Sequence, residues 1–420
     1  MAISGWVSKL RDLGKVKFII IRDSKGIAQV TLKKGVVDES LLNVVNALNL
    51  EDVIFIQGKV VERKNAPSGK EIIPNKIEIL SKAKVPLPLD ISGKIESNLD
   101  TRLDWRVLDL RRLETASLFK IQAKIVEGME EHLRNEGYLK VFTPCLMGVA
   151  SESGAEVFPV VYFEREAFLR QDPQLHRQLL IAAGFDKVFD LGPNWRSDPS
   201  HTPRHLCEYR ACAVEFGFLQ DEIDVMKVEE NLVIAAIKKI IEDCEKELKL
   251  LDKEILVPKT PFPALEFPKV YEILNEFGKK IEFGEDYDRE SELMLWKYVK
   301  EKYGNDFFFV NKFPFKVKPF YVMKSDEDSQ WARSVDLIYK GLELSSGGQR
   351  EHRYNKIISQ IEEKRLNIDA MAWFVKFFKY GVPAHGGFCI GIERLIMQML
   401  VIENIREATL FPRTPERLMP

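Results

Sequence analysis

The sequence predicts an α+β protein in which a small N-terminal β-barrel precedes a larger domain built on an antiparallel sheet. Short apolar segments separated by turn residues fill positions 3–85, and helical periodicity becomes prominent only after position 113. The later strand-like segments follow one another without regular intervening helices, which favours an antiparallel sheet over a parallel one. A chain of 420 residues has room for two or three such domains.

Residues 1–85 are predicted to form an OB-type Greek-key barrel, a fold that binds oligonucleotides on one strand face. Its expected elements are strands 16–22 and 28–32 around a turn at 23–26, a short helix at 41–48, and strands 53–61 and 71–80. The segment carries 15 Lys and Arg against 9 Asp and Glu, whereas the rest of the chain has a net charge of −8. A basic module on an acidic body favours a nucleic-acid partner, although a generic barrel with a solvated charged surface is the alternative.

Residues 86–112 are predicted to be a hinge, because Pro86 and Pro88 resist regular structure. The larger domain is expected over residues 113–420. Its predicted helices are 118–135, 224–251, 368–380 and one that begins at 393, and its predicted strands are 139–142, 188–191, 211–218, 307–310, 320–324 and the hairpin 334–344. The helix 118–135 ends at Gly137, a residue suited to a helix C-terminus.

Cysteine usage and the absence of targeting signals favour a cytoplasmic protein. The five cysteines show no CxxC spacing, so a reducing compartment is expected. The chain opens with Met-Ala-Ile-Ser-Gly-Trp, which lacks the pattern of a signal peptide, and no apolar run reaches membrane-spanning length. We therefore expect no membrane partner.

Three segments carry the signs of ATP-dependent activation of an acid. Residues 341–353 and 386–395 each place a glycine run, which allows close approach of backbone to a ligand, beside an arginine and a carboxylate. Residues 195–208 read as the loop of a β-hairpin that presents Arg196, Arg204 and His205, whose cationic groups match phosphate oxygens. No GxxxxGK[ST] segment is present, so the ATP site is not a P-loop.

Together these motifs resemble those of the class II aminoacyl-tRNA synthetases of subclass IIb, and among them the archaeal and eukaryotic-type aspartyl enzymes. The resemblance extends over essentially the whole chain, from the barrel to the closing Leu-Phe-Pro-Arg-Thr-Pro segment. It implies the antiparallel catalytic domain of that class and a homodimer formed through the first motif, between about Phe119 and Pro144. It also implies ATP, aspartate and tRNA as substrates.

For ATP, the resemblance implies two catalytic arginines and a magnesium site. Arg196 would stabilise the α-phosphate during attack by the aspartate carboxylate, and Arg394 would cover the γ-phosphate or stack on adenine. The other implied ATP ligands are Asp198, Arg204, His205 and Glu343. Asp336 and Glu343, on opposite arms of the 334–344 hairpin, would hold Mg²⁺ together with Ser346.

For the amino acid, the resemblance implies that Arg350 binds the side-chain carboxylate of aspartate as a bidentate pair. Gln174 would contact the backbone of the substrate, and Glu152, Ser346 and His352 would complete the pocket. Without the resemblance, Gln174 reads as a surface amide, Glu152 as a solvated loop residue and His352 as a core histidine.

In the barrel, Phe18, Gln29 and Glu71 match the positions at which the aspartyl family reads the anticodon. An exposed aromatic ring on such a barrel stacks on a base, while an amide and a carboxylate read base edges. The alternative is that Phe18 belongs to the barrel core.

Several positions depart from the family pattern. The second motif reads Trp195-Arg-Ser-Asp198 in place of Phe-Arg-Ala-Glu, and Cys389 replaces a glycine of the third motif. Ala213 stands where the family has an aspartate that binds the substrate ammonium. In the pocket segment, Asp172 and Arg177 replace a serine and a lysine. We expect Arg177 to act as a carboxylate partner and Asp172 to supply the negative charge lost at Ala213.

The sequence therefore predicts an aspartate–tRNA ligase with Mg²⁺ as cofactor. Whether tRNA-Asn is charged in addition to tRNA-Asp is open. The choice depends on the loop 63–70, where Lys64 and Asn65 match neither the pattern expected for tRNA-Asp alone nor the one expected for both tRNAs. The alternative is a diverged paralogue with another acid or acceptor, either an asparagine-forming amide ligase or a non-catalytic RNA-binding homologue. Phe18, Gln29 and Glu71 argue against the amide ligase, and the intact ATP residues argue against a non-catalytic protein.

Overall fold

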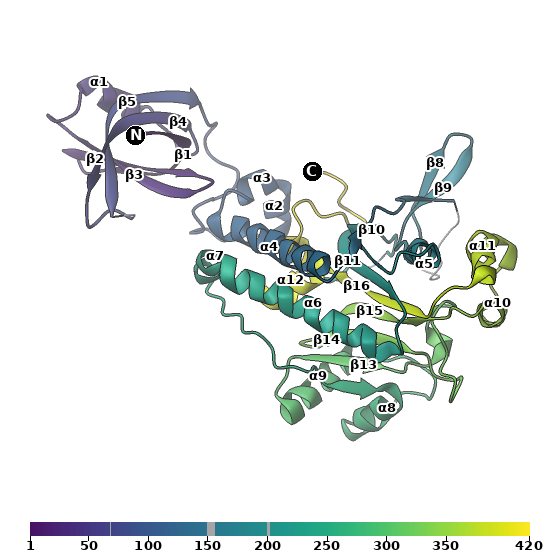
Figure 1. Cartoon of the computed structure of the whole chain (residues 1–420). Helices are drawn as coiled ribbons and strands as arrows, with labels where there is room; N and C mark the ends of the chain where they lie inside the picture. Colours follow the sequence, from purple (N-terminus) through teal and green to yellow (C-terminus); the bar gives the residue numbers. More distant parts are fainter. Residues whose placement is uncertain (68, 149–155, 200–201) are drawn as a thin grey trace. The chain divides into compact units, whose positions relative to one another are not determined.

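The computed structural model describes residues 1–67, 69–148, 156–199 and 202–420. Contacts divide the chain into two compact units, Met1–Arg112 and Leu113–Pro420, and each is described by itself (Figure 1). The expected hinge, residues 86–112, falls inside the first unit, so the division into barrel, hinge and larger domain stays a prediction. Among the helices of the described residues, none combines the length and apolar character that crossing a membrane requires.

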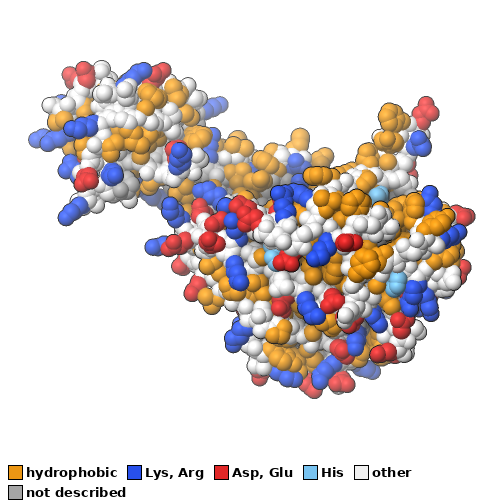
Figure 2. Space-filling view, viewed as in Figure 1, with side chains coloured by type: hydrophobic (Ala, Val, Ile, Leu, Met, Phe, Trp, Pro, Cys, Tyr) orange, Lys and Arg blue, Asp and Glu red, His pale blue; other side chains and the backbone are white. Residues whose placement is uncertain are grey.

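The first unit contains the predicted closed barrel, in which the strands neighbour one another in the order β1-β2-β3-β5-β4. Its strands are β1 Ala2–Asp12, β2 Val16–Asp23, β3 Gly26–Lys33, β4 Val53–Glu62 and β5 Lys70–Ser81. Alternate residues point inward, as Ile19, Ile21, Val30 and Leu32 show in the barrel core. The helix α1 Glu39–Asn46 begins at Asp38, whose carboxylate accepts a hydrogen bond from the backbone N–H of Ser40. On the visible face of the barrel, Lys and Arg outnumber acidic side chains (Figure 2).

Residues after the barrel contain two short helices, α2 Leu99–Asp104 and α3 Arg106–Asp109. Asp109 is fully buried and binds the guanidinium groups of Arg102 and Arg106 at 3.0 and 2.7 Å. Arg111 reaches back to the barrel, where its Nη1 lies 2.9 Å from the carboxylate of Glu51. The pairs of Asp109 hold the two short helices together, and the pair of Arg111 with Glu51 holds part of the expected hinge against the barrel, which a proline count could not predict.

The second unit is built on an eight-stranded sheet with the order β12-β13-β14-β15-β16-β11-β10-β6. The strands are β6 Leu139–Lys140, β10 Lys187–Trp195, β11 Glu208–Gly217, β12 Ala264–Glu266, β13 Phe307–Asn311, β14 Ser334–Tyr339, β15 Leu342–Arg350 and β16 His385–Gly391. Every pairing is antiparallel except at the two edges, where β6 and β12 run parallel to their neighbours. The predicted antiparallel sheet is confirmed.

One face of this sheet is covered by helices α4 Leu113–Asn135, α6 Glu222–Asp243 and α12 Ile392–Leu400 (Figure 1). On α4 the apolar positions that predict this helix form one stripe, in which Leu118 is partly buried and Ile121, Ile125, Met129 and Leu133 are fully buried in the core between helices and sheet. The expected single helix 224–251 is wrong in one respect. It breaks at Cys244, with φ −117° and ψ 23°, and continues as α7 Glu245–Leu250.

The remaining elements surround the other face and the ends of the sheet. They are the small sheet β7 Leu146–Met147, β8 Pro159–Tyr162 and β9 Arg165–Leu169, helices α5 Gln174–Ala182, α8 Phe267–Glu276, α9 Arg289–Tyr303, α10 Tyr354–Glu363 and α11 Ile368–Val375, and the 3₁₀ turns η1 Phe315–Val317, η2 Lys376–Tyr380 and η3 Ile405–Ala408. The expected strand at 320–324 is wrong. Only isolated bridges form there, from Val322 to Arg350 and from Lys324 to Ala332.

The hairpin of β14 and β15 contains an irregularity that places the site. Its two-residue turn, Lys340-Gly341, has φ of 47° and 69°, the left-handed values that a tight hairpin turn requires. Asp336 pairs with Ser346 and Leu337 with Ser345, but Ile338 pairs with Glu343, so Leu344 is an extra residue. Because of this β-bulge, side chains of β15 do not alternate regularly across Leu344, and the residues before it face the opposite side of the sheet from the one they would face in a regular strand.

Candidate active site

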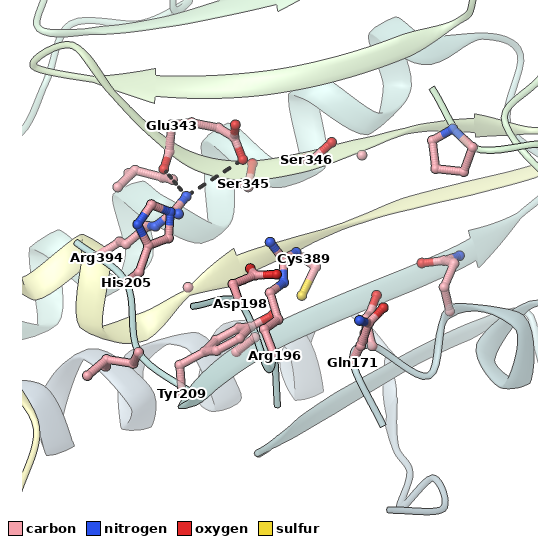
Figure 3. A pocket seen from close by; sticks show the side chains of 18 of the residues that line it. Gln171, Arg196, Asp198, His205, Tyr209, Glu343, Ser345, Ser346, Cys389 and Arg394 are labelled. Atoms are coloured by element: carbon pink, nitrogen blue, oxygen red, sulfur yellow. Dashed lines mark hydrogen bonds and ion pairs between the residues drawn. The ribbon is translucent and has the colours of Figure 1, made fainter. Parts of the chain in front are cut away.

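A cavity of about 460 Å³ opens on the face of the large sheet that α4, α6 and α12 leave uncovered. The strand register explains its lining. Cys389 of β16 pairs with both Ala213 and Ser346, so these three residues share one face, while the adjacent Ile390 packs into the core on the other. Figure 3 shows Glu343, Ser346 and Arg394 on one side of the cavity and Arg196, Tyr209 and Gln171 on the other.

The β10–β11 hairpin presents the expected phosphate ligands. Its strands pair from Lys187–Phe216 to Trp195–Glu208, so the loop that follows Trp195 stands at the cavity. The Arg196 guanidinium lies 5.9 Å from the centre of the Tyr209 ring. Tyr209, and then the carboxylates of Glu343 and Asp198, raise the pKa of Arg196. Arg196 is therefore held as a fixed cation beside the open space.

Positive charges converge beside this loop. Burial lowers the pKa of Arg204, and the nearby guanidinium groups of Arg289 and Arg394 lower it further. Burial, Arg394 and Arg204 likewise lower the pKa of His205. Mutual repulsion of this kind is relieved when a polyanion binds, so the cluster suits a triphosphate. Arg394 donates from Nη1 to the backbone oxygen of Glu343 at 3.0 Å (Figure 3).

The expected metal ligands lie together at the bulge. Asp336 is buried, and the Ser346 hydroxyl donates to it at 2.7 Å. Burial raises the pKa of Asp336 to about 6, and the negative charge of Glu343 adds to that rise. Two carboxylates and a hydroxyl fit Mg²⁺, which takes one or two carboxylates plus phosphate oxygens and water. Within the described ranges no group of three or more His, Cys, Asp or Glu could hold a metal, so the phosphates would have to complete the shell.

Arg350 stands at the amino-acid end of the cavity. Its Nε donates to the Glu215 carboxylate at 3.0 Å, and its Nη2 donates to Gln174 Oε1 and to the backbone oxygen of Gly387 at 3.1 and 2.9 Å. Gln174 in turn donates to Glu215 at 2.8 Å. Nη1 of Arg350 makes no hydrogen bond with any residue that the structure describes. It is the part of the guanidinium left for a ligand.

The two substituted pocket residues bind each other. Arg177 Nη1 and Nη2 donate to the two oxygens of Asp172 at 2.8 and 2.7 Å, and Nη2 also donates to Gln174 at 2.9 Å. Arg177 is fully buried and does not line the cavity, whereas Asp172 does. Burial alone would raise the pKa of Asp172, but the positive charge of Arg177 and its hydrogen bonds outweigh burial, so the pKa of this carboxyl is lowered. Asp172 is therefore a carboxylate at the cavity wall.

Other expected residues fall outside the cavity lining. His352 does not line it, and burial lowers the pKa of its imidazole. Asp336 is likewise behind the wall, covered by Lys318. Glu152 lies outside the described residues. Lys318 and Tyr209 line the cavity but escaped the sequence reasoning, because both lie outside the segments 195–208, 341–353 and 386–395 that drew attention.

The structure places the three residues of the second expected site, Phe18, Gln29 and Glu71, on one face of the barrel. Phe18 pairs with Thr31 across β2 and β3, and Gln29 pairs with Glu71 across β3 and β5, so their side chains share one face. Phe18 is half-buried there and is absent from the barrel core. Glu71 is 2% exposed and accepts hydrogen bonds from Thr31, Gln29 and Arg63. The face offers an aromatic ring beside a bonded amide–carboxylate group.

Comparison with known proteins assigns both units to described families. Residues 98–415 match the family of class II tRNA synthetases (D, K and N), and residues 1–80 match an OB-fold nucleic acid binding domain. The aspartate–tRNA(Asp) ligase of Pyrococcus furiosus is 47% identical over all of this chain and 95% of the relative. The aspartate–tRNA(Asp/Asn) ligase of Methanopyrus kandleri is 44% identical with the same coverage. The crystal structure of asparaginyl-tRNA synthetase from Pyrococcus horikoshii with asparaginyl-adenylate is similar at a TM-score of 0.93 and 31% identity, over 100% of this chain and 96% of that one.

Proposed function

Because the chain belongs to the class II tRNA synthetases of the aspartate, lysine and asparagine group, we propose that it is an aspartate–tRNA ligase. In the first step a carboxylate oxygen of aspartate attacks the α-phosphorus of ATP, and pyrophosphate leaves. In the second, a hydroxyl at the 3′ end of tRNA attacks the carbonyl carbon of the aspartyl-adenylate, and AMP leaves. The attacking carboxylate is already ionised at neutral pH, so the first step needs no side-chain base.

Charge stabilisation is the main contribution of this chain to the first step. Arg196, fixed by Tyr209, neutralises charge that develops on the α-phosphate. Arg204, His205 and Arg394 hold the outer phosphates, which relieves the repulsion among the cations there. Asp198 accepts from the adenine amino group. Asp336, Glu343 and Ser346 would hold Mg²⁺, which when bound neutralises the phosphate oxygens and the leaving pyrophosphate.

The hydrogen bonding of Arg350 is the observation that supports aspartate as the acid that the enzyme activates. Its guanidinium is fixed by Glu215, Gln174 and Gly387 while Nη1 is left for a ligand. A guanidinium held in this way prefers a carboxylate to an amide, because the two opposite charges attract each other whereas an amide carries no charge. Aspartate is therefore favoured over asparagine.

Asp172 takes over the role of the carboxylate that is missing at Ala213. Ala213 pairs with Cys389, and neither offers a negative charge for the substrate ammonium. Asp172 lines the same cavity as an ionised carboxylate, and each of its oxygens can accept a second hydrogen bond beyond the one from Arg177. Arg177 acts as the partner that keeps this carboxylate in place.

The barrel face of Phe18, Gln29 and Glu71 reads the tRNA anticodon, with Phe18 stacking on one base. A homodimer forms through residues 119–144. This is supported by the exposed apolar side chains at its end, since Phe142 is 87% exposed. A role in protein synthesis places the protein in the cytoplasm.

Aspartate-dependent exchange of pyrophosphate into ATP tests the proposed function. The assay is run without tRNA, with asparagine and glutamate as control acids, and is followed by charging of tRNA-Asp and tRNA-Asn transcripts. Exchange with aspartate alone supports the proposal, and the two transcripts then decide the acceptor. Absence of exchange with all three acids in a folded protein would reject it.

A second candidate is a diverged paralogue with another acid or acceptor. Ala213 and Cys389 favour it, because together they remove a carboxylate and add a thiol at one point of the pocket. Exchange driven by an acid other than aspartate would support this candidate, as would activation of the side-chain carboxylate of aspartate and its transfer to ammonia, with release of AMP and formation of asparagine.

A further inference from the structure

Lys318 is a buried cation at the edge of the candidate ATP site. It follows directly after the turn η1, and it is only 9% exposed. Its Nζ donates to Asp336 Oδ2 at 2.8 Å and lies 3.6 Å from the centre of the Phe313 ring. The ring face and the carboxylate together fix an ammonium whose transfer from water would otherwise be costly.

The ammonium stabilises a pair of acids that would repel each other. Asp336 is buried, and the negative charge of the nearby Glu343 adds to the rise that burial causes in the pKa of Asp336. Lys318 and the Ser346 hydroxyl are the groups that oppose this repulsion at Asp336. In the form described, Lys318 therefore acts as the counter-ion of the expected metal ligands.

The position of Lys318 also controls access to Asp336. Lys318, Glu343 and Ser346 line the cavity, whereas Asp336 does not. A divalent cation that reaches Asp336 from the cavity must displace the ammonium. A displaced ammonium on a flexible four-carbon stem stays at the cavity wall, on the side where the phosphates of ATP would lie.

We propose that Lys318 is a further ATP-binding residue, which neutralises Asp336 before ligand binding and contacts the triphosphate after Mg²⁺ has taken its place. This inference rests on the proposed function of the cavity as the ATP site. It predicts two opposite effects of the same side chain. Lys318 competes with Mg²⁺ for Asp336, and it adds a charge-assisted hydrogen bond to the bound nucleotide.

Calorimetric titration of ATP into the full chain, at a series of free Mg²⁺ concentrations and without amino acid, tests the proposal. In Lys318→Met the Mg²⁺ concentration for half-maximal ATP binding should fall severalfold, because no ammonium competes. At saturating Mg²⁺ the same variant should bind ATP about tenfold more weakly, through loss of one charged contact. If Lys318 had only a structural role, the variant would need more Mg²⁺ for half-maximal ATP binding and would also bind ATP more weakly at saturating Mg²⁺.

Three further variants make the outcome decisive. Lys318→Arg keeps the charge and should resemble the wild type. Lys318→Gln keeps a donor for Asp336 and should show the same opposite shifts, should the methionine variant not fold. Lys324→Met is the matched control, since Lys324 also lies over a phenylalanine ring but pairs with Glu363. Its two quantities should not change.

The inference would be overturned if a folded Lys318 variant showed the wild-type Mg²⁺ requirement and ATP affinity. It would also be overturned if the variant needed more Mg²⁺ and bound ATP more weakly at saturating Mg²⁺. Pyrophosphate exchange is measured on the same proteins. A wild type that binds ATP with Mg²⁺ but shows no aspartate-dependent exchange would reject the proposed function, while the binding data would still decide the role of Lys318.

Discussion

At the scale of single residues, the candidate site is a set of charges fixed by other charges. Arg350 is held by Glu215, Arg177 by Asp172, and Lys318 by Asp336. A buried charge that loses its partner costs far more than an exposed one, so each pair should respond sharply to substitution. Substrate preference then depends on which donors or acceptors each pair leaves unused.

Replacement of Arg350 by lysine should reduce kcat/KM for aspartate-dependent pyrophosphate exchange by about 100-fold. A lysine cannot satisfy Glu215, Gln174 and the substrate carboxylate at once. The affinity for ATP should change little, which calorimetry would check. Arg333→Lys is the control, because Arg333 bonds Gln349 and does not line the cavity. Equal losses in both variants would contradict the assigned role.

Replacement of Asp172 by serine should raise the KM for aspartate about tenfold or more, because the substrate ammonium loses its carboxylate. The triple variant Asp172→Ser, Arg177→Lys, Ala213→Asp restores the family pattern and should recover a low KM. Steady-state exchange kinetics at varied aspartate measure both effects. A normal KM in the single variant would show that Asp172 does not bind the ammonium.

At the scale of elements, the bulge of β15 orients the acid pair. Leu344 packs in the core beside α6, and the hydroxyl of the next residue, Ser345, donates to Glu229 of α6. Two consecutive residues thus face the helix, and Glu343 is turned to the cavity side that Ser346 occupies. Burial raises the pKa of Glu229 to about 8, while the Ser345 hydrogen bond lowers it.

Glu229 should make the protein less stable as the pH rises. Its folded pKa of about 8 lies above the ordinary value of 4.5, so the folded state keeps a proton that the unfolded state has lost. Stability is fully retained below about pH 4.5 and declines between there and pH 8. Glu229→Gln lacks this decline.

Melting temperatures of the wild type and Glu229→Gln, measured from pH 5 to pH 8, check the expectation. The advantage of the glutamine variant should grow with pH. Glu222→Gln is a matched control on the same helix, since Glu222 is also buried. A constant difference between Glu229→Gln and the wild type would show that Glu229 is already ionised in the folded protein.

Local patterns in the sequence were enough to predict most helices and strands and the residues of the three motifs. The stripe on α4 and the barrel strands follow from periodicity, and Arg196, Glu343, Arg350 and Arg394 follow from their motifs. The break at Cys244 could not be predicted, because no glycine or proline marks it. The bulge and the pairs Asp172–Arg177 and Lys318–Asp336 arise from tertiary contacts that no spacing rule contains.

At the scale of the whole molecule, two compact units carry two expected sites. The barrel would bind tRNA, and the larger unit would perform the chemistry. Pyrophosphate exchange needs only the second unit's cavity, whereas charging of tRNA needs both. Substitutions can therefore be assigned to a unit by comparing the two assays.

Replacement of Phe18 by alanine should raise the KM for tRNA about tenfold and leave pyrophosphate exchange unchanged. Base stacking on an aromatic ring contributes about 1–3 kcal/mol, and the exchange reaction uses no tRNA. Charging kinetics with a tRNA-Asp transcript provide the measurement. Phe55→Ala, on β4 of the same barrel, is the control. An unchanged KM for tRNA in Phe18→Ala would place the anticodon elsewhere.

The extra residue in β15 also restricts how this hairpin can vary among descendants of the gene. Loss of one codon at Leu344 would give a regular ladder between β14 and β15 and would leave the tight turn at Lys340-Gly341 intact. Side chains alternate in a regular strand, so Glu343 would stay on the cavity side, directly before Ser345 on the α6 side and Ser346 on the cavity side. Such a deletion would keep the acid in the cavity but remove the buried side chain of Leu344 from the core, at a cost of about 2–5 kcal/mol. A deletion at this position should therefore be selected against for reasons of stability more than of chemistry.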